Sequence, residues 1–319
     1  MKANRPWRRI TALLFSFLLY AACPTVTALA YGEAAAGRTA SLTVYFGKNG
    51  DGFPEVGFRV YRVADLSEAG GYTLSGDFRE YPVSLENLDS SGWRALAQTL
   101  DAYAARDGLQ PLRTEKTGQD GRAVFPGLSV GLYLVTGERF ADEGTTAAPE
   151  PLLVGLPGLS QEGWNDDVEI SCKFDSEDAP SGPVKRKLLK VWKDDGREGE
   201  RPEEIAVQLL KNGMVADTVT LSRENNWEYT WENLDGGSTW QVAELETPEG
   251  YTVSVAQEGT AFVMTNTRSG TPPSEPDIPP GLPQTGMLWW PVPPLVCGGL
   301  LLVAAGLFVR RRQGEPNEK

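Results

Sequence analysis

The sequence contains no histidine among its 319 residues. Histidine is the commonest general base in enzymes and a frequent metal ligand, so its absence argues against an ordinary hydrolase and against a metal centre. No pair of carboxylates is placed to form a catalytic cleft for an outside substrate. We therefore predict a protein that is not an enzyme and that needs neither a cofactor nor a metal.

Cysteine is scarce as well. Of three cysteines, Cys23 and Cys297 lie in apolar terminal segments that we expect to be discarded, which leaves Cys172. The exported part then has no internal disulfide, and Cys172 is expected to be a buried small apolar residue. Because extracellular domains often need a covalent staple, a cross-link of another kind is expected.

Positive charge is in short supply. The chain has 30 Lys and Arg against 43 Asp and Glu, a net charge of -13. Both terminal segments are basic, so the part between them is more acidic still. Such a surface repels nucleic acid and offers no basic patch for phosphates, so no nucleic-acid partner is expected.

The N-terminus has the features of a secretory signal peptide. Basic residues precede an apolar run over residues 10–22, and Ala28 and Ala30 fit a small-x-small cleavage site. This pattern predicts a signal peptide over residues 1–30 that is removed after Ala30. A lipoprotein cleavage box ending at Cys23 is the alternative, but Tyr20 fits it poorly.

The C-terminus combines a short polar motif, an apolar run and a basic stop. The motif occupies residues 282–286, and its residues are Leu282, Pro283, Gln284, Thr285 and Gly286. Residues 287–309 are long and apolar enough to span a bilayer. The arginines of the tail, 310–319, favour the cytoplasmic side and place the rest of the chain outside.

This arrangement resembles the sorting signal of Gram-positive surface proteins, whose L-P-x-T-G motif is read by sortase. The resemblance implies that sortase cleaves between Thr285 and Gly286. Thr285 is then joined to the amine of a peptidoglycan precursor. The implied location is the cell wall, reached from a membrane-spanning precursor. An ordinary membrane anchor with a chance pentapeptide is the alternative.

Residues 185–268 alternate apolar and polar side chains, which predicts short strands packed as a small β-sandwich. The sets that share a strand face are Leu188, Lys190 and Trp192; Ile205, Val207 and Leu209; Trp227, Tyr229 and Trp231; Trp240, Val242 and Glu244; and Phe262, Met264 and Asn266. Asn212-Gly213 predicts a hairpin turn after the second set.

Lys190, Glu244 and Asn266 stand on the apolar faces of their strands, where a lone charge is costly. We interpret them as a group that meets in the core. A buried lysine loses its proton easily, and its neutral amine can attack the carboxamide of Asn266. A buried, protonated Glu244 can polarise that amide, so that ammonia leaves and an isopeptide bond forms. An edge position or a shifted register is the alternative, and Glu246 could replace Glu244.

The same region resembles a Cna B-type domain. The resemblance is carried by residues 190–192, 201–205, 226–230, 244–251 and 265–267. It implies an autocatalytic bond between Lys190 and Asn266, with Glu244 as the acidic catalyst. A covalent tie between the first and last strands suits a stalk, since the domain cannot be extended past it.

Residues 40–175 predict a second β-domain with an inserted helix. Strands are expected at 41–46, 58–63, 123–125 and 132–135. Residues 91–107 place apolar side chains at helical spacing, with Ser90 or Ser91 as N-cap and Gly108 past the end. We expect this helix to face the core; a partner-binding helix is the alternative. No isopeptide is expected here, because residues 41–46 lack lysine and Gly137 stands where an acid is needed.

This order resembles the N-terminal domain of sortase-assembled pilins, whose motif W-x-x-x-V-x-V-Y-P-K supplies an acceptor lysine. The matching positions are Trp164, Val168, Ile170 and Lys173, with Ser171 and Cys172 in place of Tyr and Pro. A second pilin feature, the E-box, is approximated by residues 240–251. The resemblance makes Lys173 a candidate acceptor for the next subunit, and a solvated strand-end lysine is the alternative.

Together these features predict an all-β chain of two Cna B-type sandwiches with immunoglobulin-like or prealbumin-like topology. Residues 176–184 are expected to be an exposed linker and 269–281 an extended Pro-rich wall linker. The predicted function is a pilus or fimbrial subunit that has sortase and other pilin subunits as partners. A monomeric wall-anchored adhesin or stalk, with a host or matrix ligand, is the alternative.

Overall fold

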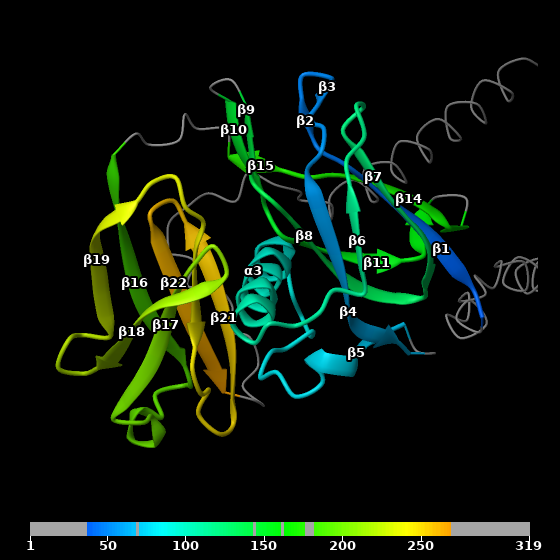
Figure 1. Cartoon of the computed structure of the whole chain (residues 1–319). Helices are drawn as coiled ribbons and strands as arrows, with labels where there is room; N and C mark the ends of the chain where they lie inside the picture. The colour runs from blue at the N-terminus through cyan, green and yellow to red at the C-terminus, as the bar shows by residue number, and fades with distance from the viewer. Residues whose placement is uncertain (1–36, 68–69, 143–144, 161–162, 176–181, 269–319) are drawn as a thin grey trace, which may run out of the picture. The chain divides into compact units, whose positions relative to one another are not determined.

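The computed structural model describes residues 37–67, 70–142, 145–160, 163–175 and 182–268 (Figure 1). Over these residues the chain is mostly β and has one α-helix. The predicted terminal segments lie outside the described residues: the signal peptide, the wall linker, the LPQTG motif, the transmembrane segment and the basic tail. No helix in the described part is long and apolar enough to cross a membrane.

The first domain has two main sheets (Figure 1), and their inward side chains form one apolar core. One sheet has the order β14-β1-β7, and the other has the order β11-β8-β4-β5 with β6 beside β4. Their strands are β1 (Thr39–Tyr45), β4 (Gly57–Leu66), β5 (Tyr72–Leu74), β6 (Arg113–Lys116), β7 (Arg122–Ser129), β8 (Gly131–Gly137), β11 (Leu152–Leu156) and β14 (Asp167–Ser171). Strand β1 runs parallel to β14 and antiparallel to β7.

Short ladders and one 3₁₀ turn complete this domain. The short strands are β2 (Gly47–Lys48), paired with β3 (Asp51–Gly52); β9 (Phe140–Asp142), paired with β10 (Thr145–Pro149); β15 (Phe174–Asp175), also paired with β10; and β12 (Gly158–Ser160), paired with β13 (Gly163–Asn165). The turn η1 (Gly76–Phe78) follows β5.

Alternation of side chains builds the core of the first domain. Ala40, Leu42 and Val44 of β1 are buried, while their neighbours along the strand are not. On the facing sheet, Phe58 and Val60 of β4 are fully buried. A strand places alternate side chains on opposite faces, so the predicted strands and their inward faces are confirmed here.

The helix α3 (Ser90–Arg106) is confirmed, but its predicted serine N-cap was wrong. The N-cap is Asp89, whose carboxylate accepts a hydrogen bond from the N–H of Gly92 at 2.7 Å. A carboxylate also interacts more favourably than a hydroxyl with the positive end of the helix dipole. Gly108 follows the helix with φ 63°, a conformation that glycine adopts without strain.

The second domain has a four-stranded sheet with the order β19-β16-β22-β21 and a three-stranded sheet with the order β18-β17-β20 (Figure 1). Its strands are β16 (Pro183–Lys193), β17 (Glu204–Lys211), β18 (Met214–Ser222), β19 (Glu228–Asp235), β20 (Trp240–Glu244), β21 (Tyr251–Glu258) and β22 (Ala261–Arg268). A 3₁₀ turn, η2 (Glu198–Glu200), lies between β16 and β17. Strand β16 begins inside the segment predicted as a linker.

The inward-facing sets predicted for β16, β17, β20 and β22 are buried or half-buried. Of the three aromatic residues predicted to share a face of β19, Trp231 is buried and Trp227 is half-buried against the core, whereas Tyr229 is exposed. Tyr229 is 38% exposed, and Trp227 lies before the strand in a turn with φ 59°. That turn returns the chain from β18 to β19, and the Trp227 ring instead packs edge-on against Trp192.

The predicted hairpin at Asn212-Gly213 is confirmed. Both residues have positive φ, 51° and 80°, as a two-residue turn of type I′ requires. The turn joins β17 to β18, which pair antiparallel with Lys211 opposite Met214.

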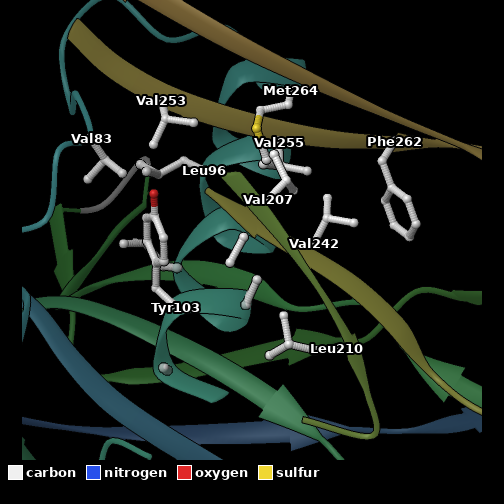
Figure 2. Packing of buried hydrophobic residues seen from close by; sticks show 14 of the residues in the cluster. Val83, Leu96, Tyr103, Val207, Leu210, Val242, Val253, Val255, Phe262 and Met264 are labelled. Atoms are coloured by element: carbon white, nitrogen blue, oxygen red, sulfur yellow. The ribbon is translucent and has the colours of Figure 1, made fainter. Parts of the chain in front are cut away.

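Helix α3 is buried from two sides. It packs on β8 and β11 of the first domain and on β20 and β21 of the second. Its apolar residues join one cluster with inward residues of the second domain, as Figure 2 shows for Leu96 and Tyr103 near Val253 and Val255. From the sequence we predicted only that α3 packs on the core of the first domain, to which it belongs.

A buried ion pair closes the end of β16. The carboxylate of Asp194, 1% exposed, accepts hydrogen bonds from Arg201 Nε at 2.6 Å and Nη2 at 2.8 Å. The hydroxyl of Tyr251 donates a third at 3.3 Å. The Arg201 guanidinium holds the pKa of Asp194 below its ordinary value of 3.8. This contact ties the loop after β16 to the edge strand β21.

Replacing Asp194 by Asn is expected to lower the free energy of unfolding at pH 7 by about 2 kcal/mol, because a charge-assisted pair is lost. A carboxyl with a lowered folded-state pKa adds stability above its ordinary value of 3.8, and this stability disappears as the pH falls through the folded-state pKa. Urea unfolding of wild type and Asp194→Asn between pH 7 and pH 2 measures this difference. The control is Asp195→Asn at the exposed neighbouring position; an equal loss in both variants would contradict the assignment.

Candidate functional site

Lys190, Asn266 and Glu244 come together in the core of the second domain. Lys190 lies on β16 and Asn266 on β22, which are adjacent parallel strands. In this register Lys190 is opposite Met264 and Asn266 is opposite Trp192, so the two polar residues share the inward face. Glu244 ends β20 in the facing sheet and reaches across the sandwich.

The three side chains form one hydrogen-bonded group. Lys190 Nζ donates to Glu244 Oε1 at 2.7 Å. Asn266 Nδ2 donates to Oε1 at 3.0 Å and to Oε2 at 3.1 Å. Both nitrogen atoms therefore share one carboxylate oxygen, which holds the amine beside the amide.

The group is almost completely removed from solvent. Lys190, Glu244 and Asn266 are 4%, 1% and 0% exposed. Burial lowers the pKa of Lys190 from 10.5 to about 8, although the Glu244 carboxylate opposes this change. The Lys190 ammonium also lies 4.8 Å from the centre of the Trp192 ring. The amine can thus lose its proton near neutral pH, which a nucleophilic lysine requires.

One polar atom of the group has no partner. Among the described residues, Asn266 Oδ1 is buried and makes no hydrogen bond. A buried carbonyl without a donor is costly. A half-turn of the amide about χ2 would direct Oδ1 toward Glu244, where a protonated carboxyl could donate to it. The site therefore has the parts needed to polarise the amide carbonyl.

Glu246 is not a member of this group. Strand β20 ends at Glu244, and Glu246 lies beyond it with an exposed side chain. The alternative in which Glu246 replaces Glu244 is therefore wrong, because the chain leaves the sheet before the next inward position.

Lys173 lies in the first domain, between β14 and β15, and it is exposed. Val168 and Ile170 of the same motif are half-buried and pack on the core of the first domain. Cys172 is buried, as expected, and burial raises the pKa of its thiol to about 12. The motif therefore fixes the strand end through its apolar residues and leaves the Lys173 amine accessible.

The first domain has a parallel strand pair of its own, β1 with β14. The inward residues of β1 are Ala40, Leu42 and Val44. In the described part of this domain, the buried polar side chains are Ser75, Thr99, Thr117 and Thr136. None of these is an amine or a carboxamide, so the described core contains no counterpart of Lys190 or Asn266.

The remaining predicted sites lie outside the described residues: Ala28, Ala30, Leu282, Pro283, Gln284, Thr285 and Gly286. Within the described residues, no cluster of three or more His, Cys, Asp or Glu side chains is placed to hold a metal ion.

Sequence reasoning missed one contact of the site. Arg106 of helix α3 donates from Nη1 to the backbone oxygen of Glu244 at 2.7 Å. Arg106 belongs to the other domain, so neither strand alternation nor local spacing gives a signal for this contact. It places a cation next to the strand end that carries Glu244.

In Asn266→Ala, which has no amide to attack, Lys190 should keep its free amine. We expect the free energy of unfolding of this variant to rise on the order of 3 kcal/mol as the pH increases from about 8 to 10.5. In this range the unfolded chain binds the Lys190 proton and the folded chain does not, so stability rises with pH. Urea unfolding at a series of pH values checks this. In the double variant Asn266→Ala/Lys190→Met the free energy of unfolding should no longer rise over this pH range. A rise that persists there would contradict the assignment to Lys190.

Two family models match separate parts of the chain. The family described as "Cna protein B-type domain" matches residues 187–267. The family described as "Gram-positive pilin subunit D1, N-terminal domain" matches residues 25–173. The first match covers the domain with the buried lysine group, and the second covers the domain with Lys173.

Two curated relatives share moderate identity with the chain. A collagen adhesin of Staphylococcus aureus is 30% identical over 207 residues, covering 54% of this chain and 17% of that protein. A serine-aspartate repeat-containing protein D of S. aureus strain Newman is 30% identical over 165 residues, covering 46% and 11%. The chain thus spans less than a fifth of the length of these relatives.

Solved structures of similar proteins were also found. The full-length major pilin SpaD from Corynebacterium diphtheriae aligns with a TM-score of 0.27 and 15% identity, covering 72% of this chain and 64% of that one. A single B repeat unit of the collagen-binding surface protein of S. aureus aligns with a TM-score of 0.26 and 18% identity, covering 74% and 99%.

The two matched ranges fall on the two β-domains of the described chain. Proteins of this pilin and adhesin family are structural rather than enzymatic. The chain is a Gram-positive pilin-like surface protein that joins a pilin D1 N-terminal domain to a Cna B-type domain.

Proposed function

We propose that this chain is a structural pilus subunit of the cell wall, stiffened by an isopeptide bond between Lys190 and Asn266. The observation that carries the proposal is the buried hydrogen-bonded group in which Lys190 and Asn266 share Glu244. Each of these three side chains costs desolvation free energy in an apolar core, and a bond-forming reaction between them accounts for the presence of all three together.

The bond forms in three steps that use only these side chains. Lys190 passes a proton to Glu244 and becomes a neutral amine. Its Nζ then attacks Cγ of Asn266, and the protonated Glu244 donates a hydrogen bond to the developing oxyanion. The C–Nδ2 bond breaks as the leaving nitrogen takes one proton from Glu244 and one from the attacking Nζ, so that it departs as ammonium and Glu244 returns to the carboxylate. The net change is one new amide bond and the loss of one ammonia.

The position of the bond suits a protein that bears tension. Strands β16 and β22 are the first and last strands of the domain and are direct neighbours. Force that enters through β16 and leaves through β22 would pass through the Lys190–Asn266 amide. The chain between these two residues would then be protected from extension.

Two further positions connect the subunit to its surroundings. The LPQTG motif supports sortase cleavage after Thr285 and attachment of Thr285 to an amine of a peptidoglycan precursor or of another subunit. Lys173 supports the role of acceptor, because its amine is exposed at the end of the first domain. With both positions in use, each subunit donates through Thr285 and accepts through Lys173.

A wall-anchored adhesin or stalk is the second candidate. It is favoured by the identity of 30% that the chain shares with a protein described as a collagen adhesin. The Ser171 and Cys172 positions, which depart from the pilin motif, also fit a chain that is anchored singly. Both candidates keep the wall attachment and the isopeptide bond, and they differ in the use of Lys173.

The purified chain is expected to be lighter than its sequence mass by one ammonia, because every molecule forms the Lys190–Asn266 bond. Intact-mass spectrometry measures this directly. The variants Lys190→Ala, Asn266→Ala and Glu244→Ala are each expected to show the full sequence mass. Lys187→Ala, which changes an exposed lysine of the same strand, should keep the ammonia loss. A wild-type mass equal to the sequence mass would contradict the proposal.

Lys173→Arg is expected to abolish polymer formation, because a guanidinium keeps the charge but does not serve as the acceptor amine. Immunoblots of cell-wall extracts boiled in detergent should show a ladder for wild type and a single band for Lys173→Arg. Lys116→Arg, at another exposed lysine of the same domain, should leave the ladder intact. A single wall-linked band for wild type would instead favour the adhesin or stalk.

A further inference from the structure

One side of the second domain's sandwich is closed by the first domain. Strand β21 is an edge of the four-stranded sheet, and β20 is an edge of the three-stranded sheet. Helix α3 packs against both of these edge strands. We call this boundary between β20 and β21, covered by α3, the seam. Glu244 ends β20 and therefore lies along it.

The first domain satisfies the outer backbone groups of β21. The N–H of Val253 donates to the Pro82 oxygen at 2.7 Å, and the N–H of Val255 donates to Thr99 Oγ1 at 2.8 Å. Farther along the strand, the N–H of Gln257 donates to Gln98 Oε1 at 2.9 Å. An edge strand otherwise leaves such groups to water or to another chain, so β21 has in effect a partner supplied by α3 and the loop before it.

Apolar side chains fill the same seam. Leu96 and Tyr103 of α3 lie in one cluster with Val253, Val255 and Met264 of the second domain, as Figure 2 shows. Val253 is the cross-strand partner of Asn266, and Val255 is the partner of Met264. The helix therefore covers the strand that flanks Asn266 and helps keep water from the site.

Arg106 makes the most direct connection to the bond-forming group. Its Nη1 donates to the Glu244 backbone oxygen at 2.7 Å, and its Nε and Nη2 each donate to Asp107 at 2.7 Å. The guanidinium also lies 4.5 Å from the centre of the Tyr103 ring. Asp107 in turn accepts a hydrogen bond from Tyr81 at 2.5 Å. These contacts hold the Arg106 guanidinium in one orientation, with Nη1 directed at the Glu244 backbone oxygen.

Glu244 needs such support because of its place in the strand. It is the last residue of β20, and Leu245 after it is 45% exposed. An exposed segment such as the one that begins at Leu245 opens locally more often than a strand centre does, and it adjoins the Glu244 backbone. A carboxyl that must contact both Lys190 and Asn266 loses its function if its backbone shifts, because catalysis depends on alignment of the reacting groups.

We propose that helix α3 is a functional part of the bond-forming site in the neighbouring domain, with Arg106 as the positioning residue for Glu244. This inference rests on the isopeptide bond proposed above. The D1 domain then has a second role besides assembly: it closes the seam and holds the catalytic carboxyl, so that the Cna B-type domain cross-links itself rapidly only when the first domain is docked on it.

The test compares two replacements of similar length at Arg106. Arg106→Met keeps the apolar stem over Tyr103 but has no donor, whereas Arg106→Lys keeps a charged donor. Residues 31–285, which include every described residue, are synthesised in a cell-free reaction. The reaction is stopped at intervals in acid, and the fraction that has lost ammonia is measured by intact mass. The matched control is Arg223→Met, which removes an exposed arginine of the second domain that pairs with Glu198.

We expect Arg106→Met to form the bond about tenfold more slowly than wild type, since the charge-assisted hydrogen bond to the Glu244 backbone oxygen is lost together with the two to Asp107. Arg106→Lys should recover most of the rate, and Arg223→Met should match wild type. Equal rates for wild type and Arg106→Met would overturn the inference. If wild type itself never loses ammonia, the proposed isopeptide function fails instead, so the two failures are distinct.

A second variant guards against simple misfolding. Thr99→Val removes the acceptor of the Val255 N–H and leaves Glu244 and Arg106 unchanged. Near-ultraviolet circular dichroism of purified samples establishes that each variant is folded. A folded Thr99→Val that also forms the bond several-fold more slowly would support the seam as part of the site. If a folded Thr99→Val variant forms the bond at the wild-type rate, only Arg106 affects bond formation. That result would overturn the proposal that the packing of α3 on β21 is part of the site.

Discussion

The contact between Lys190, Glu244 and Asn266 determines how the second domain is built. A lysine, a glutamate and an asparagine with nearly no solvent exposure are tolerated only because they bond to one another. The register of β16 and β22 places the amine and the amide on one face, and the facing sheet supplies the carboxylate. Shifting either strand by one residue would turn a polar group outward and separate the three.

The dry surroundings of this contact come from both domains. Burial is the main reason that the pKa of Lys190 falls to about 8, and burial here depends on how well each side of the sandwich is closed. Helix α3 covers the side where the two edge strands β20 and β21 would otherwise face water. The D1 domain and the Cna B-type domain therefore share one apolar cluster, and under our proposal the bond-forming chemistry of the second domain depends on the packing of the first.

Much of this arrangement could be predicted from the sequence, and the misses have physical causes. Period-two alternation gave the inward faces of β16, β17, β20 and β22, and with them the three members of the site, because a half-buried strand must alternate. Trp227 was misplaced since a tight turn with positive φ has no alternation. The Asp89 cap was missed because Asp89, Ser90 and Ser91 are all suitable N-cap residues. The contact of Arg106 with Glu244 was missed because it joins residues far apart in the chain.

Peptide mapping tests the central claim most directly. Trypsin does not cleave after a lysine whose amine is acylated, so a bonded Lys190 leaves residues 188–193 in one peptide. The account predicts that this peptide is joined to residues 224–268, which contain Asn266 and no internal trypsin site, and that tandem mass spectrometry finds the branch at Lys190. Cleavage after Lys190, with both peptides recovered separately and unmodified, would contradict it.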